Sequence, residues 1–218
     1  MIETTITQIR IPVTANSAIE GNLTLPPNAS AVVTFAHGSG SSRFSPRNQY
    51  VSKTFNDNGF ATLLIDLLTT EEEEIDVSTA EYRFNIGLLA ERLIAATEWL
   101  KIDPSTKNMA FGYFGASTGA AAALIAAAKL PSEIKAVVSR GGRPDLAVDF
   151  LGQVNAPTLL IVGGDDTDVI ELNQQALDMM TAEKKLVIVP GATHLFEEPG
   201  KLDEVAEFSV DWFKQYLR

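Results

Sequence analysis

The 218-residue sequence contains no cysteine and only two histidines. Without cysteine the chain can form no disulfide, offers no thiolate to a metal, and carries no thiol nucleophile. This composition fits a reducing compartment, and we expect a cytoplasmic protein. His37 and His194 are its only side chains with an ordinary pKa suited to proton transfer near neutral pH.

Long apolar runs are also missing. The longest, residues 120–128, is far too short to span a bilayer. Residues 1–6 show neither the basic start nor the apolar stretch of a signal peptide. With 45% apolar and 21% charged residues, no repeats and no low-complexity linker, the sequence predicts one globular domain over residues 1–218.

Positive charge is scarce, because 17 lysines and arginines face 28 acidic residues and leave a net charge of −11. This balance argues against nucleic acid and anionic membrane surfaces as partners. It also disfavours strongly anionic substrates, unless a local arginine cluster overrides the overall field. We therefore expect a small-molecule substrate.

The most informative feature that is present is the pattern G-x-S-x-G, formed by Gly115, Ser117 and Gly119. An apolar segment leads into it and an alanine-rich segment follows, as expected for a strand, a sharp turn and a helix. In this context the serine is a nucleophile exposed above the sheet, close to the positive end of the helix. The flanking glycines avoid clashes in the strained turn.

A nucleophilic serine needs a general base, and His194 is the candidate. Hydrolases with this turn order their residues as serine, acid and histidine along the chain. His194 follows an apolar run downstream of Ser117, whereas His37 lies upstream and is out of order. We predict that His37 braces a loop instead.

The acid should follow a strand between Ser117 and His194. Residues 158–162 are such a run, and Asp165, Asp166 and Asp168 follow it after a Gly-Gly turn. The spacing favours Asp166 as the partner that orients the histidine. Asp168 is an alternative or a helix cap, and Asp165 an alternative or a solvated residue. No further ligand completes a metal site, so we expect neither metal nor cofactor.

An oxyanion hole requires two donors. The backbone N–H of Thr118, directly after the nucleophile, is one. The second is expected from the glycine-flanked Ser39, in the loop that follows the apolar run 31–36. A dinucleotide fingerprint is excluded here, because Arg43 occupies the third glycine position.

Several charged residues fall near these strand ends. Arg140 and Arg143 could clamp a substrate carboxylate or form structural ion pairs with Asp145 or Asp149, and Arg43 and Arg47 present the same two alternatives. The acidic segment 69–76 is predicted to be a loop, either a solvated connection or a lid.

The hydrophobic pattern predicts the architecture. Residues 6–13 and 18–25 alternate and suggest an antiparallel opening hairpin. Later runs are continuously apolar and alternate with helical segments, which is typical of a parallel sheet covered by helices on both faces. These runs are 31–36, 61–65, 109–114, 134–138, 158–162 and 186–189, with helices near 46–58, 82–101, 118–129, 169–181 and 202–217.

Together these segments resemble the α/β-hydrolase superfamily, and more closely its dienelactone-hydrolase-like branch. Beyond the serine motif, the resemblance rests on residues 37–48, 139–145 and 190–200 and extends from about residue 13 to 218. It implies an α/β-hydrolase fold, sometimes fused to a phosphoribosyltransferase domain. Dienelactone hydrolases proper use a cysteine nucleophile, so the resemblance supports the fold and the triad but not that substrate.

We therefore expect a serine hydrolase acting on a small ester, thioester or lactone through Ser117, Asp166 and His194. One alternative is an acyltransferase or perhydrolase with the same triad. Another is a non-catalytic binding or regulatory module that retains the fold.

Overall fold

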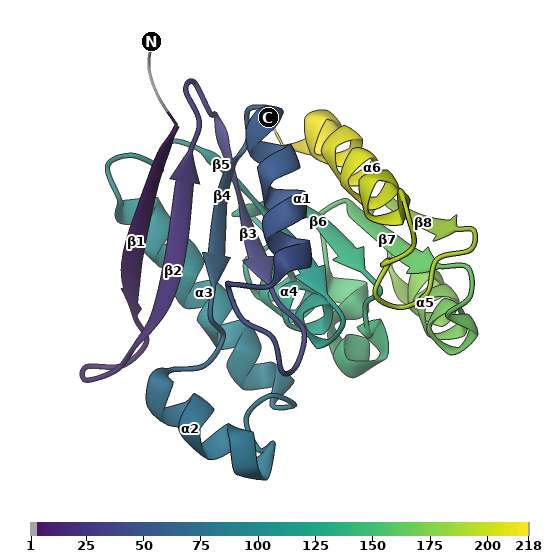
Figure 1. The fold of residues 1–218 in the computed structure, drawn as a ribbon, viewed down its shortest axis with the longest axis horizontal. Coiled ribbons are helices and arrows are strands. Elements are labelled where there is room, and N and C mark those ends of the chain that lie inside the picture. Colours follow the sequence, from purple (N-terminus) through teal and green to yellow (C-terminus); the bar gives the residue numbers. More distant parts are fainter. Residues whose placement is uncertain (1–3, 218) are drawn as a thin grey trace.

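The computed structural model describes residues 4–217, so positions 1–3 and 218 of the expected domain lie outside it. An eight-stranded sheet with the order β1-β2-β4-β3-β5-β6-β7-β8 runs through the molecule (Figure 1). The strands are β1 (Thr5–Pro12), β2 (Ala18–Leu25), β3 (Ala31–Ala36), β4 (Ala61–Ile65), β5 (Ala110–Ala116), β6 (Ile134–Arg140), β7 (Thr158–Gly163) and β8 (Lys184–Val189). The helices are α1 (Pro46–Asp57), α2 (Thr70–Thr79), α3 (Ile86–Ile102), α4 (Thr118–Lys129), a 3₁₀ segment η1 (Pro144–Gln153), α5 (Thr167–Met179) and α6 (Lys201–Tyr216).

The strand directions follow the hydrophobic pattern. β1 and β2 form an antiparallel hairpin, β2 pairs antiparallel with β4, and every other pairing is parallel. All residues of β3, β4 and β7 are buried, as expected for strands covered on both faces. The predicted α/β-hydrolase architecture is confirmed.

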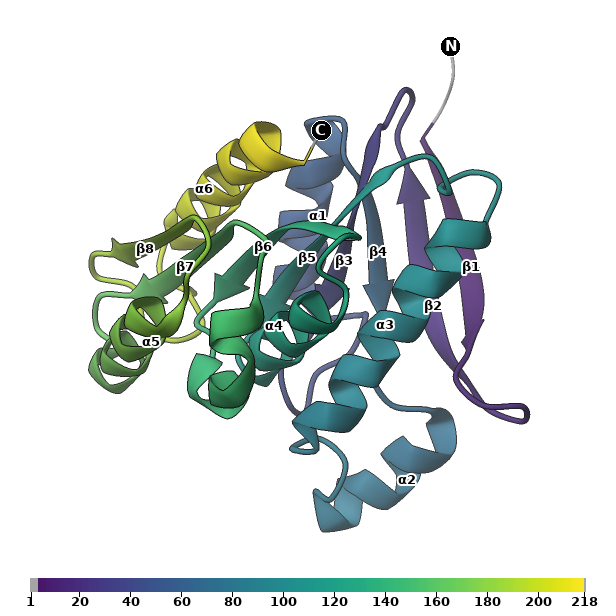
Figure 2. The same cartoon turned by 180° about the vertical axis from the view of Figure 1, so that it is seen from behind.

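Helices cover both faces of the sheet. α1 and α6 lie on one face (Figure 1), and α3, α4 and α5 lie on the other (Figure 2). Successive residues of β3 supply the two cores in turn: Val33 and Phe35 pack towards α1 and α6, and Val32 and Ala36 towards α3 and α4. The sheet is therefore the shared wall of two hydrophobic layers.

An aromatic cluster fills the layer beneath α1 and α6. Phe55 of α1 lies 5.4 Å from Phe35, 5.7 Å from Phe114 and 5.4 Å from Phe213, measured between ring centroids. All four rings are buried. Because Phe114 lies three residues before Ser117, this cluster also supports the strand that carries the serine.

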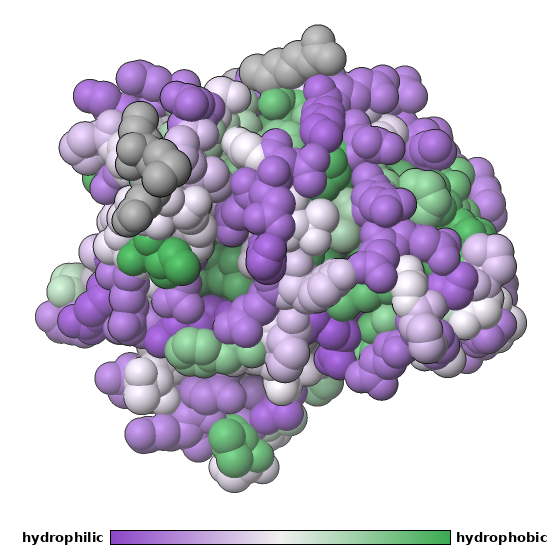
Figure 3. Space-filling view, turned by 45° about the horizontal axis from the view of Figure 1, so that its top comes forward, coloured by the Kyte–Doolittle hydropathy of each residue, from purple (hydrophilic) through white to green (hydrophobic). Residues whose placement is uncertain are grey.

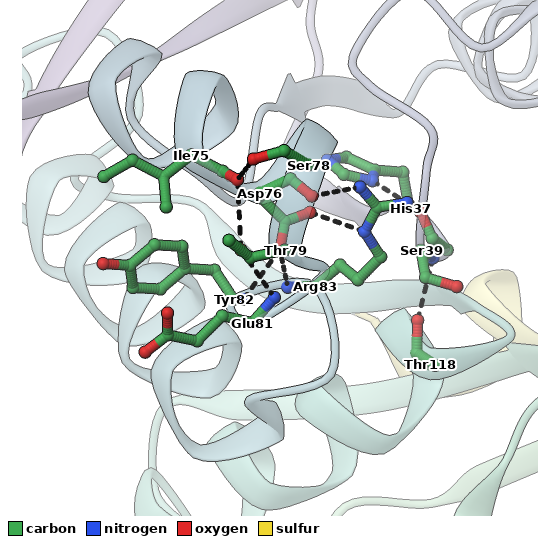
Figure 4. Close-up of polar contacts among 11 residues, drawn as sticks. His37, Ser39, Ile75, Asp76, Ser78, Thr79, Glu81, Tyr82, Arg83 and Thr118 are labelled. Atoms are coloured by element: carbon green, nitrogen blue, oxygen red, sulfur yellow. Dashed lines mark hydrogen bonds and ion pairs between the residues drawn. The ribbon is translucent and has the colours of Figure 1, made fainter.

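The acidic segment predicted as a loop is a helix, and that prediction was wrong. Thr69 and Glu72 form a reciprocal capping box at the start of α2, and acidic side chains in its first turn suit the positive end of the helix. The buried Asp76 carboxylate accepts hydrogen bonds from the backbone N–H groups of Tyr82 and Arg83 and from Arg83 Nε (Figure 4). The η1 segment was also not predicted.

The surface view in Figure 3 shows hydrophilic side chains over most of one face, with hydrophobic residues in scattered patches. Within residues 4–217, no helix combines the length and apolar character needed to cross a membrane.

Truncating the centre of the aromatic cluster should be costly. Phe55→Ala should lower the free energy of unfolding by about 3–5 kcal/mol, because it leaves a cavity among three rings. Urea denaturation measures the change. Phe84→Ala is the matched control, since Phe84 is 58% exposed and should change stability by less than about 0.5 kcal/mol. Equal losses in the two variants would contradict the role given to the cluster.

Candidate active site

The turn between β5 and α4 holds Ser117 in a strained conformation. Its φ of 50° and ψ of −121° lie where non-glycine residues are rare, at a cost of about 1–3 kcal/mol. Flanking backbone contacts hold this geometry: the Ser117 N–H donates to the Arg140 carbonyl (3.2 Å), and the Ser117 carbonyl accepts from the Arg143 N–H (3.2 Å).

The two glycines of the motif are needed for space rather than for a positive φ. A Cβ at Gly115 would lie 2.4 Å from Ala120 Cα, and a Cβ at Gly119 would lie 2.4 Å from the carbonyl oxygens of Ala36 and His37. At both glycines two backbone segments are therefore in direct contact. These contacts fix α4 beneath the turn and beside the end of β3.

His194 and Asp166 lie in contact although 28 residues separate them. His194 Nδ1 is 2.6 Å from Asp166 Oδ2. Asp166 occupies the N-cap position of α5 but makes no side-chain capping bond, so its carboxylate is directed to the histidine. Neither Asp165 nor Asp168 contacts the ring: the Asp165 N–H donates to the Ala192 carbonyl, and Asp168 lies in the first turn of α5.

Ser117 and His194 line one pocket of about 230 Å³ at the carboxyl ends of the strands. Among the described residues no hydrogen bond joins the Ser117 hydroxyl to His194. The pocket brings together the end of β5, the loops after β3 and β8, the start of α1 and the end of β6. Its lining residues are Gly38, Ser39, Ser41, Ser45, Arg47, Asn48, Ala116, Ser117, Arg140, His194 and Leu195.

The two predicted oxyanion donors lie next to each other, but one of them is occupied. The backbone N–H of Ser39 donates to Thr118 Oγ1 at 2.9 Å (Figure 4). Thr118 is the first residue of α4, so its own N–H has no acceptor within the helix. The Thr118 hydroxyl thus already accepts the hydrogen bond that the Ser39 N–H would have to give to an oxyanion.

His37 is buried, does not line the pocket that holds Ser117, and bridges two loops. Its Nδ1 lies 2.9 Å from the Gly38 carbonyl, and its Nε2 accepts from the backbone N–H of Leu67 at 3.2 Å. Both contacts are satisfied by the neutral ring protonated at Nδ1. Burial lowers the pKa of His37 below its usual value of 6.5 and so favours that form.

The four arginines near the strand ends differ in their contacts: Arg43 and Arg143 form ion pairs outside the pocket that holds Ser117, whereas Arg47 and Arg140 line it. Arg43 forms an ion pair with Asp66, and Arg143 pairs with Asp145 at 2.8 Å, one of the two partners considered from the sequence. Arg47 reaches Glu197 (2.8 Å) yet lines the pocket. Arg140 lines the pocket too, and it makes no ion pair with any residue in 4–217.

Sequence reasoning missed Asn48 and Leu195 as pocket residues. A signal for the α1 side was present: Ser45 and Pro46 mark a helix start, and Arg47 puts a cation in the first turn. Positive charge is unfavourable at that end of a helix, so it suggests a local requirement for a cation.

The neutral state of His37 predicts a dependence of stability on pH. The unfolded chain binds a proton as pH falls through 6.5, whereas the folded ring stays neutral until a lower pH. The free energy of unfolding should therefore fall below pH 6.5, by up to about 1.4 kcal/mol per pH unit.

Denaturant titrations from pH 7 down to the onset of carboxylate protonation measure this slope, which His37→Gln should remove. His194→Gln keeps His37 and should retain the slope. A slope that persists in His37→Gln would assign the effect to another group.

Comparison with known proteins agrees with this architecture. A profile described as the dienelactone hydrolase family matches residues 19–217. Two Mycobacterium tuberculosis proteins, provisionally named phosphoribosyl transferases, are 56% identical over 199 residues, which is 91% of this chain and 44% of theirs. The chain thus spans less than half the length of these curated relatives.

Two solved structures were compared with this chain. Est1E from Butyrivibrio proteoclasticus (TM-score 0.78, 95% of this chain and 99% of that one) is 17% identical and shows a shared fold alone. The crystal structure of a dienelactone hydrolase from Anabaena variabilis is 55% identical, with a TM-score of 0.97 over 99% of both chains. With a family profile that covers nearly the whole sequence, this likeness shows that the chain belongs to the dienelactone hydrolase family.

Proposed function

We propose that this chain is a serine hydrolase that cleaves a small carboxylic ester, thioester or lactone through an acyl-enzyme intermediate. The observation that carries the proposal is one pocket lined both by a serine in a strained backbone conformation and by a histidine whose Nδ1 lies 2.6 Å from a carboxylate oxygen. Membership in a hydrolase family supports the same reaction class.

Each residue of this triad has one role. Asp166 accepts a hydrogen bond from the Nδ1–H of His194, which leaves Nε2 free as the base and stabilises the imidazolium formed later. His194 takes the proton of Ser117 as Oγ attacks the substrate carbonyl, and it then protonates the leaving group. Water then attacks the acyl-enzyme while His194 takes its proton. His194 returns a proton to Ser117 Oγ as the bond to the acyl group breaks, and the carboxylic acid is released. The Ser117 hydroxyl forms its bond to His194 when substrate fills the pocket.

We assign the oxyanion hole to the backbone N–H groups of Thr118 and Ser39. The Thr118 N–H lies at the positive end of α4, which favours developing negative charge. The Ser39 N–H must exchange its bond with Thr118 Oγ1 for a bond to the oxyanion. This exchange opposes part of the stabilisation gained in the transition state.

A fluorophosphonate probe tests the nucleophile directly. The adduct should form on Ser117, as located by mass spectrometry, and should be lost in His194→Ala. With an ester that is turned over, Ser117→Ala should reduce kcat by about 10⁴-fold or more, and Asp166→Asn by about 10⁴-fold.

Asp165→Asn is the matched control for the acid, because Asp165 does not contact His194. Near-normal turnover in Asp166→Asn would mean that the acid is misassigned. A folded protein that is not labelled would favour a non-catalytic binding module, and acyl transfer to an added alcohol in place of water would identify an acyltransferase.

The bond between Ser39 and Thr118 predicts a gain of activity. Thr118→Val removes the competing acceptor and keeps the size of the side chain, so kcat should rise by about two- to tenfold, the worth of one hydrogen bond. Thr118→Ser keeps the acceptor and should stay below Thr118→Val. A fall in kcat for Thr118→Val alone would show that the hydroxyl itself serves the oxyanion.

A further inference from the structure

One face of α1 is turned towards the core, and its first residue is polar. The buried residues of this helix are Asn48, Val51, Ser52 and Phe55, at the three- and four-residue spacing of one helix face. Val51 and Phe55 belong to the hydrophobic core, and the Ser52 hydroxyl donates to the Gln49 carbonyl at 2.9 Å. Asn48 therefore holds an amide where the pattern of the helix calls for an apolar side chain.

The Asn48 side chain carries an unused hydrogen-bond acceptor. It is 2% exposed, it lines the pocket that holds Ser117, and its Oδ1 has no hydrogen-bond partner among residues 4–217. An unpaired buried polar group is costly, and for that reason buried amides in proteins are as a rule hydrogen-bonded. Water satisfies such a group in an open pocket, and a substrate that displaces the water has to supply a replacement hydrogen bond.

The position of this amide relative to the nucleophile is fixed by α1. The Asn48 N–H donates to Ser45 Oγ at 3.4 Å, which caps the start of the helix. Further along α1, the ring of Phe55 lies 5.7 Å from that of Phe114, three residues before Ser117. The helix that carries the amide thus packs directly on the strand that carries the serine.

The rest of the pocket lining is also rich in hydroxyl groups. Ser41 comes from the loop after β3 and Ser45 from the cap of α1. Of the lining residues, only Ala116 and Leu195 carry an aliphatic side chain. A hydrocarbon substituent bound here would deprive polar groups of water without replacing its hydrogen bonds, whereas a hydroxylated substituent replaces them.

We propose that Asn48 is a specificity-determining residue that binds an uncharged hydroxyl group of the substrate, close to the scissile bond. This inference rests on the proposed hydrolase function and narrows its substrate class to hydroxylated acyl compounds. A hydroxyl donates to an amide oxygen and accepts from an amide nitrogen, so it matches Asn48 in either orientation of the amide. A methyl group in its place leaves the buried amide unpaired, and sites of this kind discriminate strongly between the two.

Ester pairs in which a methyl group replaces the hydroxyl test this specificity. Methyl 3-hydroxybutanoate is compared with methyl 3-methylbutanoate, methyl lactate with methyl 2-methylpropanoate, and 2-hydroxyethyl butanoate with propyl butanoate. In at least one pair, the ratio of kcat/KM for the hydroxyl ester to that for the methyl ester should be higher in the unmodified protein than in Asn48→Leu, by about tenfold or more. Comparing ratios cancels the intrinsic reactivity of each ester and any narrowing of the pocket by leucine.

Gln49→Leu is the matched control. Gln49 is an exposed amide on the same helix and does not line this pocket, so its replacement should leave every ratio unchanged. Ratios that are the same in Asn48→Leu and in the unmodified protein for all three pairs would overturn the inference. Turnover of the methyl esters would in that case still support the hydrolase function.

Stability separates a binding role of Asn48 from a structural one. Because Oδ1 has no partner within the described part of the chain, Asn48→Leu should leave the urea midpoint of unfolding unchanged or raise it. A lower midpoint combined with unchanged ratios would assign Asn48 to the packing of α1 alone and contradict the inference. If Asn48→Leu does not fold, Asn48→Ala takes its place, with the same loss of the ratio expected.

Binding to Ser117→Ala tests the site without turnover, so failure of the hydrolase proposal is seen separately. NMR titrations of this variant with the same pairs should show tighter binding of the hydroxyl ester in at least one pair, and the difference should disappear when Asn48→Leu is added. Equal binding within every pair, or a difference that persists in the double variant, would contradict the inference.

Discussion

The close contact of backbone with backbone around Ser117 is the constraint on which the site depends. Gly115 leaves room for Ala120, and Gly119 lies against the end of β3. Residues 118–127 of α4 are all buried, and most of them are alanine, so the helix can lie close beneath the turn. One tight junction thus fixes the serine, the start of α4 and the loop after β3 together.

The parallel sheet extends this constraint to the other site residues. Because the central strands run in one direction, the segments after β3, β5, β7 and β8 emerge at one edge. Asp166 and His194 come from the last two of these and meet at 2.6 Å. Asp166 occupies the N-cap position of α5, but its side chain contacts His194 and makes no capping hydrogen bond to the helix.

Electrostatics divides this edge into two regions. Around α2 acidic groups are held by capping and by ion pairs such as those of Glu72 with Arg92 and Asp76 with Arg83. In the pocket that holds Ser117, Arg140 forms no ion pair with any residue in 4–217, and its Nε has no hydrogen-bond partner there. The pairing of β6 with β5 holds Arg140 in this pocket, although the burial of a charge is costly.

The sequence by itself determined the strand order along the chain, most of the helices, the hairpin and the serine turn, because these follow from local periodicity and short motifs. It did not determine α2, because four consecutive glutamates suggested a solvated loop, and the capping box of Thr69 and Glu72 became evident only in the structure. It left three aspartates and four arginines as alternatives. Only the tertiary structure decided that Asp166 reaches His194, that Arg43 and Arg143 are paired, and that Arg140 forms no ion pair within the described residues 4–217. The contacts of Asp166 with His194 and of Arg43 with Asp66 join segments that lie apart in the sequence, and no local pattern encodes such distances. The Arg143–Asp145 pair is local, but the sequence could not decide between it and a role in substrate binding.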